Sequence, residues 1–322
     1  MPRWLKHLFA ASSIVALAAC GGSSDDAETE AVAETPKHIV QVAQDAPQFS
    51  VLVEAVVAAD LAGVLSGPGP FTVFAPTNEA FVALLGELGV TKDQLLADKA
   101  LLTRVLTYHV VAGNVPKAAV PAGQPIATVE GGIFKVDAVG DALVVTDGRN
   151  RNATITATDI AASNGVIHVI DRVILPADRN VVETAVALAS ATPAEFTILV
   201  EAVLAADLAG ALSADGPFTV FAPTDAAFAA LLAELGVTKD ALLADTALLT
   251  RVLTYHVVAG RVLKAQVPVA LPVATLQGDT FTVGDDLTIT DQRARRAAIV
   301  ATDVLASNGV IHVIDTVILP AP

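Results

Sequence analysis

The stretch GVTKDQLLADKALLTRVLTYHVVAG, residues 89–113, recurs almost unchanged as GVTKDALLADTALLTRVLTYHVVAG at residues 236–260. Self-similarity over this distance along a chain is the signature of a duplicated structural unit. The chain therefore consists of two copies of one domain, and its function has to be one that a doubled module can serve.

The copies differ in length at a predicted loop. DAVGDALVVTD, residues 137–147, aligns with GDDLTITD, residues 284–291, so the second copy is three residues shorter here. A polar, glycine-containing bend between two apolar runs is typical of a surface hairpin loop. Each copy spans about 140 residues, which is an ordinary domain size. We expect domain 1 at residues 36–176 and domain 2 at residues 181–320.

The first twenty residues, MPRWLKHLFAASSIVALAAC, have the pattern of an export signal. Arg3 and Lys6 precede an apolar run that is too short to span a bilayer, and small residues precede Cys20. The sequence Leu-Ala-Ala-Cys at residues 17–20 resembles the lipobox of bacterial lipoproteins, in which the signal is removed and the Cys is lipidated. We expect a lipoprotein signal peptide at residues 1–19 and lipid attachment at Cys20. The alternative is an ordinary signal peptide with a stray Cys.

The segment after Cys20 is acidic and contains few large apolar side chains. This composition predicts a disordered tether at residues 20–35. The lipoprotein resemblance implies an exported protein anchored in the membrane through its lipid alone. Because no Asp directly follows Cys20, the same resemblance favours the outer membrane or cell surface as its location.

The charge balance argues against nucleic acid as a partner. Without Arg3 and Lys6 the count of Lys and Arg falls from 19 to 17, against 34 Asp and Glu. Cation clusters are needed to neutralise phosphates. The short clusters Arg149/Arg151 and Arg293/Arg295/Arg296 are interpreted as loop or edge-strand charges rather than as an anion site.

Each copy begins with helical patterns and continues with strand patterns. Apolar spacing predicts a helix at residues 49–65. Thr77 or Asn78 can cap a helix at residues 79–86, a capping box of Thr91 and Gln94 opens the next helix, and Asp98 can cap a helix at residues 99–106. Short runs rich in Val, Ile and Thr predict strands in the first copy at residues 71–74, 126–130, 133–138, 143–146, 153–158 and 166–175. This order predicts an α+β fold, with a helical layer beside a mainly antiparallel sheet or sandwich.

Three blocks occur in the same order in both copies. In the first copy they are FTVFAPTNEAF at residues 71–81, Tyr108-His109, and NGVIHVIDRVILP at residues 164–176. Together they resemble the fasciclin-like domain, and the resemblance covers nearly all of the chain after the tether. It implies two domains, each a β-sandwich wedge with helices packed on it, in an extracellular or surface protein of adhesion and matrix organisation.

The resemblance also implies a contact region. In animal members the Tyr-His region is implicated in integrin contact, which maps here to Tyr108, His109, Tyr255 and His256. This chain has two copies, a lipoprotein-like start, no cysteine-rich module and no Arg-Gly-Asp sequence. An integrin is therefore not the partner that we expect.

The same residues also have a structural interpretation. His109 lies between the end of a predicted helix and the apolar residues Val110-Val111, which favours a buried imidazole with a satisfied hydrogen bond. His168, and its counterpart His312, alternate with apolar residues on one face of a strand, which favours packing. Asp171 and its counterpart Asp315 lie on the opposite face and need a donor. For Asp171 the candidates are a backbone amide and His109.

Catalytic motifs are absent from the sequence, which has no nucleophile elbow, phosphate-binding loop, dinucleotide fingerprint or paired-His metal motif. We therefore expect no enzyme, no cofactor and no metal site. The first hypothesis is a surface-anchored module that binds a protein or glycan of the extracellular matrix or of another cell, helped by avidity. The alternative is a carrier of a small apolar ligand, which would require a cavity of roughly several hundred Å³.

Overall fold

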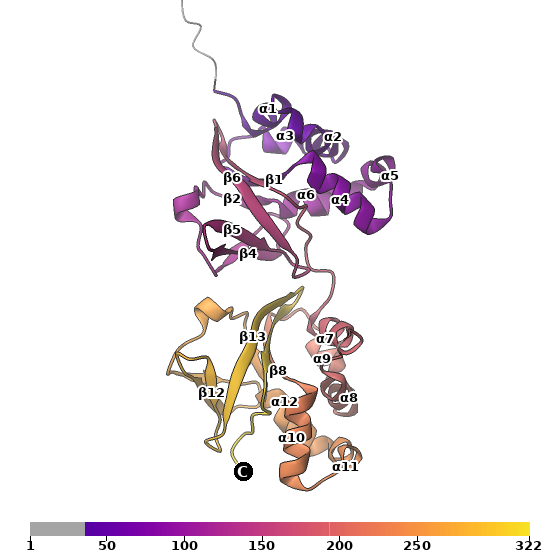
Figure 1. The fold of residues 1–322 in the computed structure, drawn as a ribbon, viewed down its shortest axis with the longest axis vertical. Coiled ribbons are helices and arrows are strands. Elements are labelled where there is room, and N and C mark those ends of the chain that lie inside the picture. The colour runs from indigo at the N-terminus through magenta and orange to yellow at the C-terminus, as the bar shows by residue number, and fades with distance from the viewer. Residues whose placement is uncertain (1–35, 193) are drawn as a thin grey trace, which may run out of the picture. The chain divides into compact units, whose positions relative to one another are not determined.

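The structure is a computed structural model that describes residues 36–192 and 194–322. Both copies lie within one compact unit, Pro36–Pro322 (Figure 1). The expected signal peptide, Cys20 and the acidic tether lie outside the described residues. The two copies are called domain 1 and domain 2 below.

Domain 1 places its helices early in the chain and most of its strands afterwards. Its α-helices are α1 (Ile39–Gln44), α2 (Ser50–Ala58), α3 (Ala62–Leu65), α4 (Asn78–Leu88), α5 (Lys92–Ala97) and α6 (Lys99–Tyr108). Its strands are β1 (Phe71–Pro76), β2 (Val110–Ala112), β3 (Pro125–Ala127), β4 (Ile133–Val139), β5 (Ala142–Thr146), β6 (Asn152–Ala162) and β7 (Gly165–Ile170).

Domain 2 repeats this order. Its α-helices are α7 (Val181–Ala189), α8 (Thr197–Ala205), α9 (Ala209–Leu212), α10 (Asp225–Leu235), α11 (Lys239–Ala244) and α12 (Thr246–Tyr255). Its strands are β8 (Phe218–Pro223), β9 (Val257–Ala259), β10 (Pro272–Ala274), β11 (Thr280–Val283), β12 (Thr288–Thr290), β13 (Arg296–Ala306) and β14 (Gly309–Ile314). The α+β prediction is confirmed.

The predicted caps fix where the helices of domain 1 begin. The Thr77 side chain accepts a hydrogen bond from the first turn of α4, Thr91 and Gln94 form the expected capping box of α5, and Asp98 caps α6. These side chains satisfy amide groups that have no partner within the helix. Gly89, at φ 66°, then ends α4 in the left-handed conformation that glycine adopts without strain.

Several predicted element boundaries were wrong. The strand expected at residues 126–130 ends at Ala127, and the strand expected at residues 153–158 continues to Ala162. The helix expected at residues 49–65 is broken into α2 and α3, because Asp60 has a φ of 61°, which a right-handed helix cannot contain. The last strand, expected to run to Leu175, ends at Ile170. Beyond it the backbone amides of Ile174 and Leu175 donate to the side chains of His109 and Asp147 instead of to a neighbouring strand.

Each domain has one seven-stranded sheet, ordered β2-β1-β7-β6-β5-β4-β3 in domain 1 and β9-β8-β14-β13-β12-β11-β10 in domain 2. The β1–β7 and β8–β14 pairs are parallel and the other pairs are antiparallel, as expected. The long strands β6 and β13 each contain two shifts of register, and Asp159 and Asp303, both with a φ of 62°, lie at the second shift of their strands. Such bulges re-aim a side chain away from the regular alternation.

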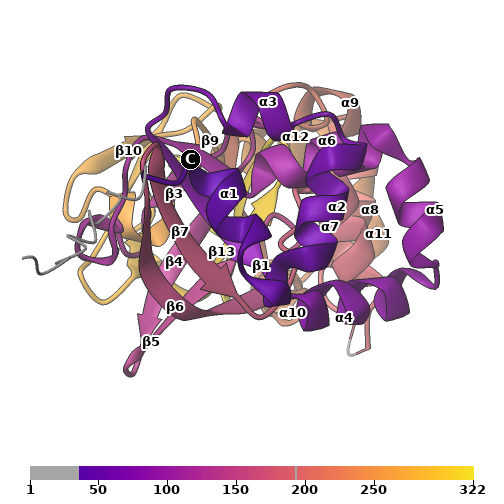
Figure 2. The same ribbon diagram turned by 90° about the horizontal axis from the view of Figure 1, so that it is seen from above.

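The sheet of domain 1 separates two apolar cores. One core fills the space between the helices and β1 and β7, with Phe49, Phe81 and Leu102 among its buried residues. The other is enclosed by the strands themselves and includes Phe74 and Phe134, whose rings meet edge to face. Figure 2 shows the helices of domain 1 gathered on one side and β3 to β6 on the other. At the end of α6, Tyr108 belongs to the core enclosed by the strands, and His109 lines a small cavity on the side of the helices.

Candidate functional site

Tyr108 and His109 lie at the C-terminal end of α6 and are buried, with 0% and 2% of their surfaces exposed. Their counterparts Tyr255 and His256 have the same exposures at the end of α12. A partner protein therefore has no direct access to these four side chains in this structure. The pairs influence a contact surface only through the fold that they support.

The imidazole of His109 joins α6 to the segment that follows β7. Its Nδ1 lies 2.7 Å from the carbonyl oxygen of Val105, and its Nε2 accepts from the backbone amide of Ile174 at 3.1 Å. Because Nε2 accepts, Nδ1 carries the proton and the ring is neutral. Burial lowers the pKa of His109 to about 4, which keeps the ring in this form near neutral pH.

The phenol of Tyr108 closes the strand-lined core. It donates to the carbonyl oxygen of Ile133 at 2.5 Å, and its ring meets that of Phe134 edge to face. Burial raises the pKa of Tyr108 well above its usual range, and burial likewise raises the pKa of Tyr255 to about 12. Both phenols are therefore protonated donors that hold a strand in place.

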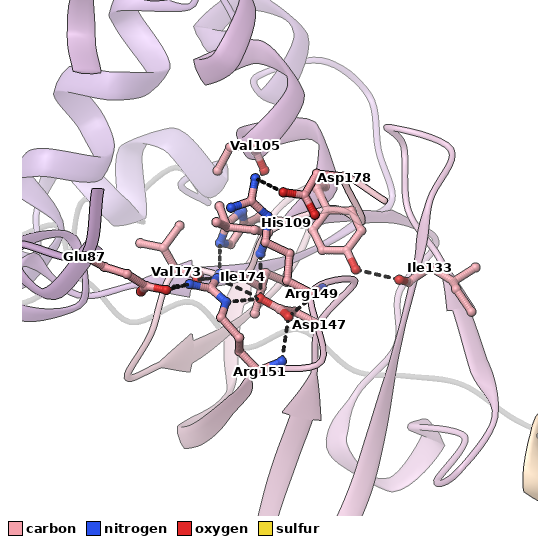
Figure 3. A network of polar contacts seen from close by, with 12 residues as sticks. Glu87, Val105, His109, Ile133, Asp147, Arg149, Arg151, Val173, Ile174 and Asp178 are labelled. Carbon is pink, nitrogen blue, oxygen red and sulfur yellow. Dashed lines mark hydrogen bonds and ion pairs between the residues drawn. The ribbon is translucent and has the colours of Figure 1, made fainter. Parts of the chain in front are cut away.

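Asp147 is a buried carboxylate that the sequence did not single out. It accepts from the backbone amides of Arg149, Arg151 and Leu175, each at 2.9 Å, and pairs with the Arg151 guanidinium at 2.8 Å. Arg151 also donates to Glu87 and to the carbonyl oxygen of Val173, both at 2.9 Å. Figure 3 shows this network beside His109, with α4, the β5–β6 turn and the segment after β7 all contributing.

The network gives the first arginine cluster a structural role. Arg149 and Arg151 lie in the loop between β5 and β6, in agreement with their interpretation as loop charges. The Arg151 side chain is 14% exposed and pairs with Asp147 and Glu87, and Arg149 pairs with Asp178 at 3.0 Å. These loop charges therefore also tie parts of the chain together. The signal that could have found them is the spacing Asp-x-Arg-x-Arg, which occurs in both copies, at Asp147 and at Asp291.

His168 lies apart from His109 and serves a different strand. Its Nε2 lies 2.9 Å from the carbonyl oxygen of Val115, and its Nδ1 accepts from the amide of Asp159 at 3.4 Å. His312 repeats both contacts in domain 2, with Val262 and Asp303. Each ring is buried and holds the bulge of the long strand.

Asp171 and Asp315 are exposed at the end of the last strand of each domain. Asp171 accepts from the amide of Thr154 at 2.6 Å, and Asp315 accepts from the amide of Ala298 at 2.8 Å. Of the two donors considered for Asp171, the structure shows the backbone amide and no hydrogen bond from His109. Among the residues that the structure describes, no three His, Cys, Asp or Glu side chains are grouped so as to bind a metal ion.

The apolar cavities beneath the helices are small. The cavity of domain 2, lined by Val181, Leu199 and His256 among others, has a volume of about 60 Å³, and the matching cavity of domain 1 has about 30 Å³. Pockets for small molecules have volumes of roughly 300–1,000 Å³. Neither cavity could hold a ligand without rearrangement of the core.

Both domains expose the same apolar position on the outer helices. Val57 on α2 is 60% exposed, and its counterpart Leu204 on α8 is 61% exposed. One turn before each, a glutamate on the same helix pairs with a lysine on another outer helix. Glu54 pairs with Lys92 of α5, and Glu201 pairs with Lys239 of α11, both at 2.7 Å. We define the helix surface of each domain as this apolar residue and the ion pair beside it. They are surfaces that the duplicated chain presents twice with the same chemistry.

Comparison with known proteins identifies relatives for both copies. A family model described as the fasciclin domain matches residues 47–176 and 194–320. Protein sll1483 of Synechocystis sp. is 46% identical over 153 residues, which is 46% of this chain and 78% of that protein. Transforming growth factor-beta-induced protein ig-h3 of Sus scrofa is 31% identical over 261 residues, which is 80% of this chain and 35% of that protein.

Two further similarities are more limited in extent or closeness. Human periostin is 35% identical over 136 residues, which is 42% of this chain and 15% of periostin. A solved FAS1 domain pair from the insect cell adhesion molecule fasciclin I covers 85% of this chain and 97% of that chain, with a TM-score of 0.40 and 19% identity. In the part of this chain that the structure describes, no helix has the length and hydropathy needed to cross a membrane.

Proposed function

The chain belongs to the fasciclin domain family, which confirms the resemblance seen in its sequence, and we propose that it is a surface-anchored adhesion or matrix-binding protein. The observation that carries this proposal is the repeated helix surface, with Val57 and Leu204 equally exposed beside identical ion pairs. Two copies of one surface bind a multivalent partner through avidity. A protein or glycan of the matrix or of another cell is such a partner.

The function is binding rather than catalysis. The histidines, tyrosines and carboxylates that the sequence singled out serve hydrogen bonds within each domain and do not converge on an open cavity. The small cavities also weigh against the alternative of an apolar carrier. Filled cores and outward-facing apolar side chains favour contact with a large partner.

Anchoring through Cys20 completes the proposal. The basic start, the short apolar run and the solitary Cys of the sequence support it. Acyl chains on Cys20 would hold the acidic tether and both domains at the surface of the cell. Metabolic labelling with a clickable fatty acid should mark the natural chain, and equal labelling of a Cys20→Ser variant would refute this anchor.

The test of the binding function changes one helix surface at a time in the whole chain. A charge at the centre of an apolar contact removes that contact, so we expect Val57→Glu and Leu204→Glu each to weaken binding to immobilised matrix extract by roughly a hundredfold. The double variant should not bind measurably. Surface plasmon resonance gives the affinities.

Val139→Glu is the matched control, because Val139 is 60% exposed and lies in the hairpin that is shorter in domain 2. It adds the same charge to domain 1 at a position that is not repeated. We expect its binding to equal that of the natural chain. Unchanged binding of the Val57→Glu and Leu204→Glu variants would show that the helix surfaces are not the contact sites.

A further inference from the structure

Domains 1 and 2 meet at a set of polar contacts that bridge distant parts of the sequence. Lys135 on β4 reaches the carboxylate of Asp303 on β13 at 2.9 Å, and 3% of the Asp303 side chain is exposed. Asn150 forms two hydrogen bonds with the backbone of Leu305, accepting from its amide at 2.6 Å and donating to its carbonyl at 3.0 Å. Each contact joins a side chain of domain 1 to the long strand β13 of domain 2.

Apolar packing accompanies these polar contacts. Ile133 of domain 1 packs on a cluster of domain 2 formed by Leu263, Leu305 and Val310, whose exposures are 0%, 2% and 0%. We call Ile133, Lys135 and Asn150 the junction face of domain 1. Leu263, Asp303 and Leu305 form the junction face of domain 2.

The face of domain 1 that corresponds to the junction face of domain 2 keeps the aspartate of the bulge but carries different side chains beside it. Asp159 takes the place of Asp303 with the same φ of 62°, and it accepts from the amide of Lys117 as Asp303 does from Lys264. The Asp159 side chain is exposed, however, and Pro116 and Ala161 stand exposed in the places of Leu263 and Leu305. The apolar contact groups are therefore missing from this free face.

The opposite free face, on domain 2, lacks the complementary groups. Thr280, Thr282 and Ala294 occupy the places of Ile133, Lys135 and Asn150. The main-chain conformation is retained at the third position, since Ala294 has a φ of 57° and Asn150 one of 61°. Domain 2 therefore lacks the large apolar side chain, the cation and the amide side chain at these places, while the positive φ of the third position is retained.

We propose that the junction is a keyed interface, in which the junction face of domain 1 accepts the junction face of domain 2 and the two free faces do not accept each other. If two chains met head to tail, Asp159 would be buried against Thr282 without a cation, which is strongly unfavourable for a carboxylate. A head-to-tail contact between identical repeats otherwise propagates into open filaments. The keyed interface therefore holds the two domains of one chain together as one body, and the free faces prevent further chains from adding head to tail.

The first experiment tests whether the junction locks the pair, using residues 21–322, which retain the whole compact unit. The variant Ile133→Thr, Lys135→Thr, Asn150→Ala gives domain 1 the side chains that domain 2 carries at the same places. In the natural chain, ¹⁵N relaxation should give one rotational correlation time for both domains. In the variant, the rotational correlation time of each domain should fall toward the value for a body of half the mass. The dispersion of its amide spectrum shows whether the variant remains folded. Independent tumbling in the natural chain, or a folded variant that still tumbles as one body, would overturn the proposal.

The second experiment gives the two free faces the side chains that the junction faces carry. One chain carries Thr280→Ile, Thr282→Lys and Ala294→Asn, a second carries Pro116→Leu and Ala161→Leu, and a third carries all five substitutions. Sedimentation velocity should show concentration-dependent association of the third chain, whereas the natural chain and each partial variant alone stay monomeric. Association of the natural chain would refute the proposal. So would a five-substitution chain that stays monomeric at about 1 mM, a concentration that reveals even weak contacts. The inference concerns the pair itself and is independent of the partner that the helix surfaces bind.

Discussion

The two domains share a fold and the motif Asp-x-Arg-x-Arg, but the second arginine of the motif forms different ion pairs in each. In domain 1 the Arg151 guanidinium pairs with buried Asp147 and with Glu87. In domain 2 the matching Arg295 pairs with Glu234 at 3.1 Å, and no hydrogen bond or ion pair in the described structure joins its side chain to that of Asp291. The Nη1 of Arg295 is buried without a partner. An identical Asp-x-Arg-x-Arg spacing therefore produces two different electrostatic arrangements.

The contacts of the backbone around these carboxylates remain the same. Asp291 accepts from the amides of Arg293, Arg295 and Leu319, as Asp147 does from the corresponding amides. What the motif specifies in both copies is thus the turn and its link to the C-terminal segment. The ion pair is an addition that domain 1 makes and domain 2 does not, and the comparison predicts unequal stability effects at equivalent positions.

The largest expected effect is that of Arg151→Met. This change leaves the Asp147 carboxylate 1% exposed and without its cation, so we expect a loss of about 3–5 kcal/mol in the free energy of unfolding. Arg295→Met removes a pair with the half-exposed Glu234, so the loss should be about 1 kcal/mol or less. Denaturant unfolding followed by circular dichroism measures both.

Lys92→Met is the control for loss of a cation from an exposed pair, and its effect should match that of Arg295→Met. Equal losses for Arg151→Met and Arg295→Met would contradict the difference between the domains. They would indicate that both arginines have the same partners in solution.

The second prediction concerns positions where the domains should behave alike. His109→Ala leaves a cavity and two unpaired groups, the carbonyl of Val105 and the amide of Ile174, which should cost about 2–4 kcal/mol. His256→Ala should cost the same, because His256 makes the equivalent contacts with Val252 at 2.8 Å and Ile318 at 3.1 Å. Thermal melts of the two variants, compared with the natural chain, give the result. Unchanged melts together with lost matrix binding would favour a contact role for these residues.

The sequence could predict the elements that depend on local signals. The caps Thr77, Thr91 and Asp98 were found because they act within three residues of the groups that they satisfy. The break at Asp60 was missed because no Gly or Pro marks the place, and an Asp adopts positive φ too seldom to indicate a break by itself, although it does so more often than most residues. The end of the last strand was misplaced because its apolar run continues beyond Ile170 to Leu175. The backbone amides of the last residues of this run donate to His109 and Asp147, which are distant in sequence, and not to a neighbouring strand.

The site was predicted in the same uneven way. Apolar neighbours in the sequence indicated that His109 and His168 pack in the core, but they could not name Val105, Ile174 or Val115 as partners. In the sequence Asp147 cannot be told from other aspartates in turns. Only the structure shows that three backbone amides and the Arg151 guanidinium contact its carboxylate. The junction faces could not be found at all, because complementarity between two surfaces exists only when both are placed in space.

The smallest expected effect is a difference in the order in which two buried histidines titrate. Burial lowers the pKa of both His109 and His256 to about 4, whereas an unfolded histidine titrates near 6.5. Between these values the unfolded chain binds more protons, so the stability that each neutral ring contributes is complete above about pH 6.5 and is lost as the pH falls toward 4. The loss should be about 3 kcal/mol for each histidine.

Within that window the neighbouring charges separate the domains. Arg151 lowers the pKa of His109, whereas Asp291 raises the pKa of His256, so His256 should take up its proton first on acidification. An NMR titration of the imidazole C–H signals gives the order in which the two rings take up their protons. Arg151→Met should shift the titration of His109 toward that of His256 and leave His256 unchanged. If His109 instead titrates first in the natural chain, the unequal placement of Arg151 and Arg295 does not control the charge around these rings.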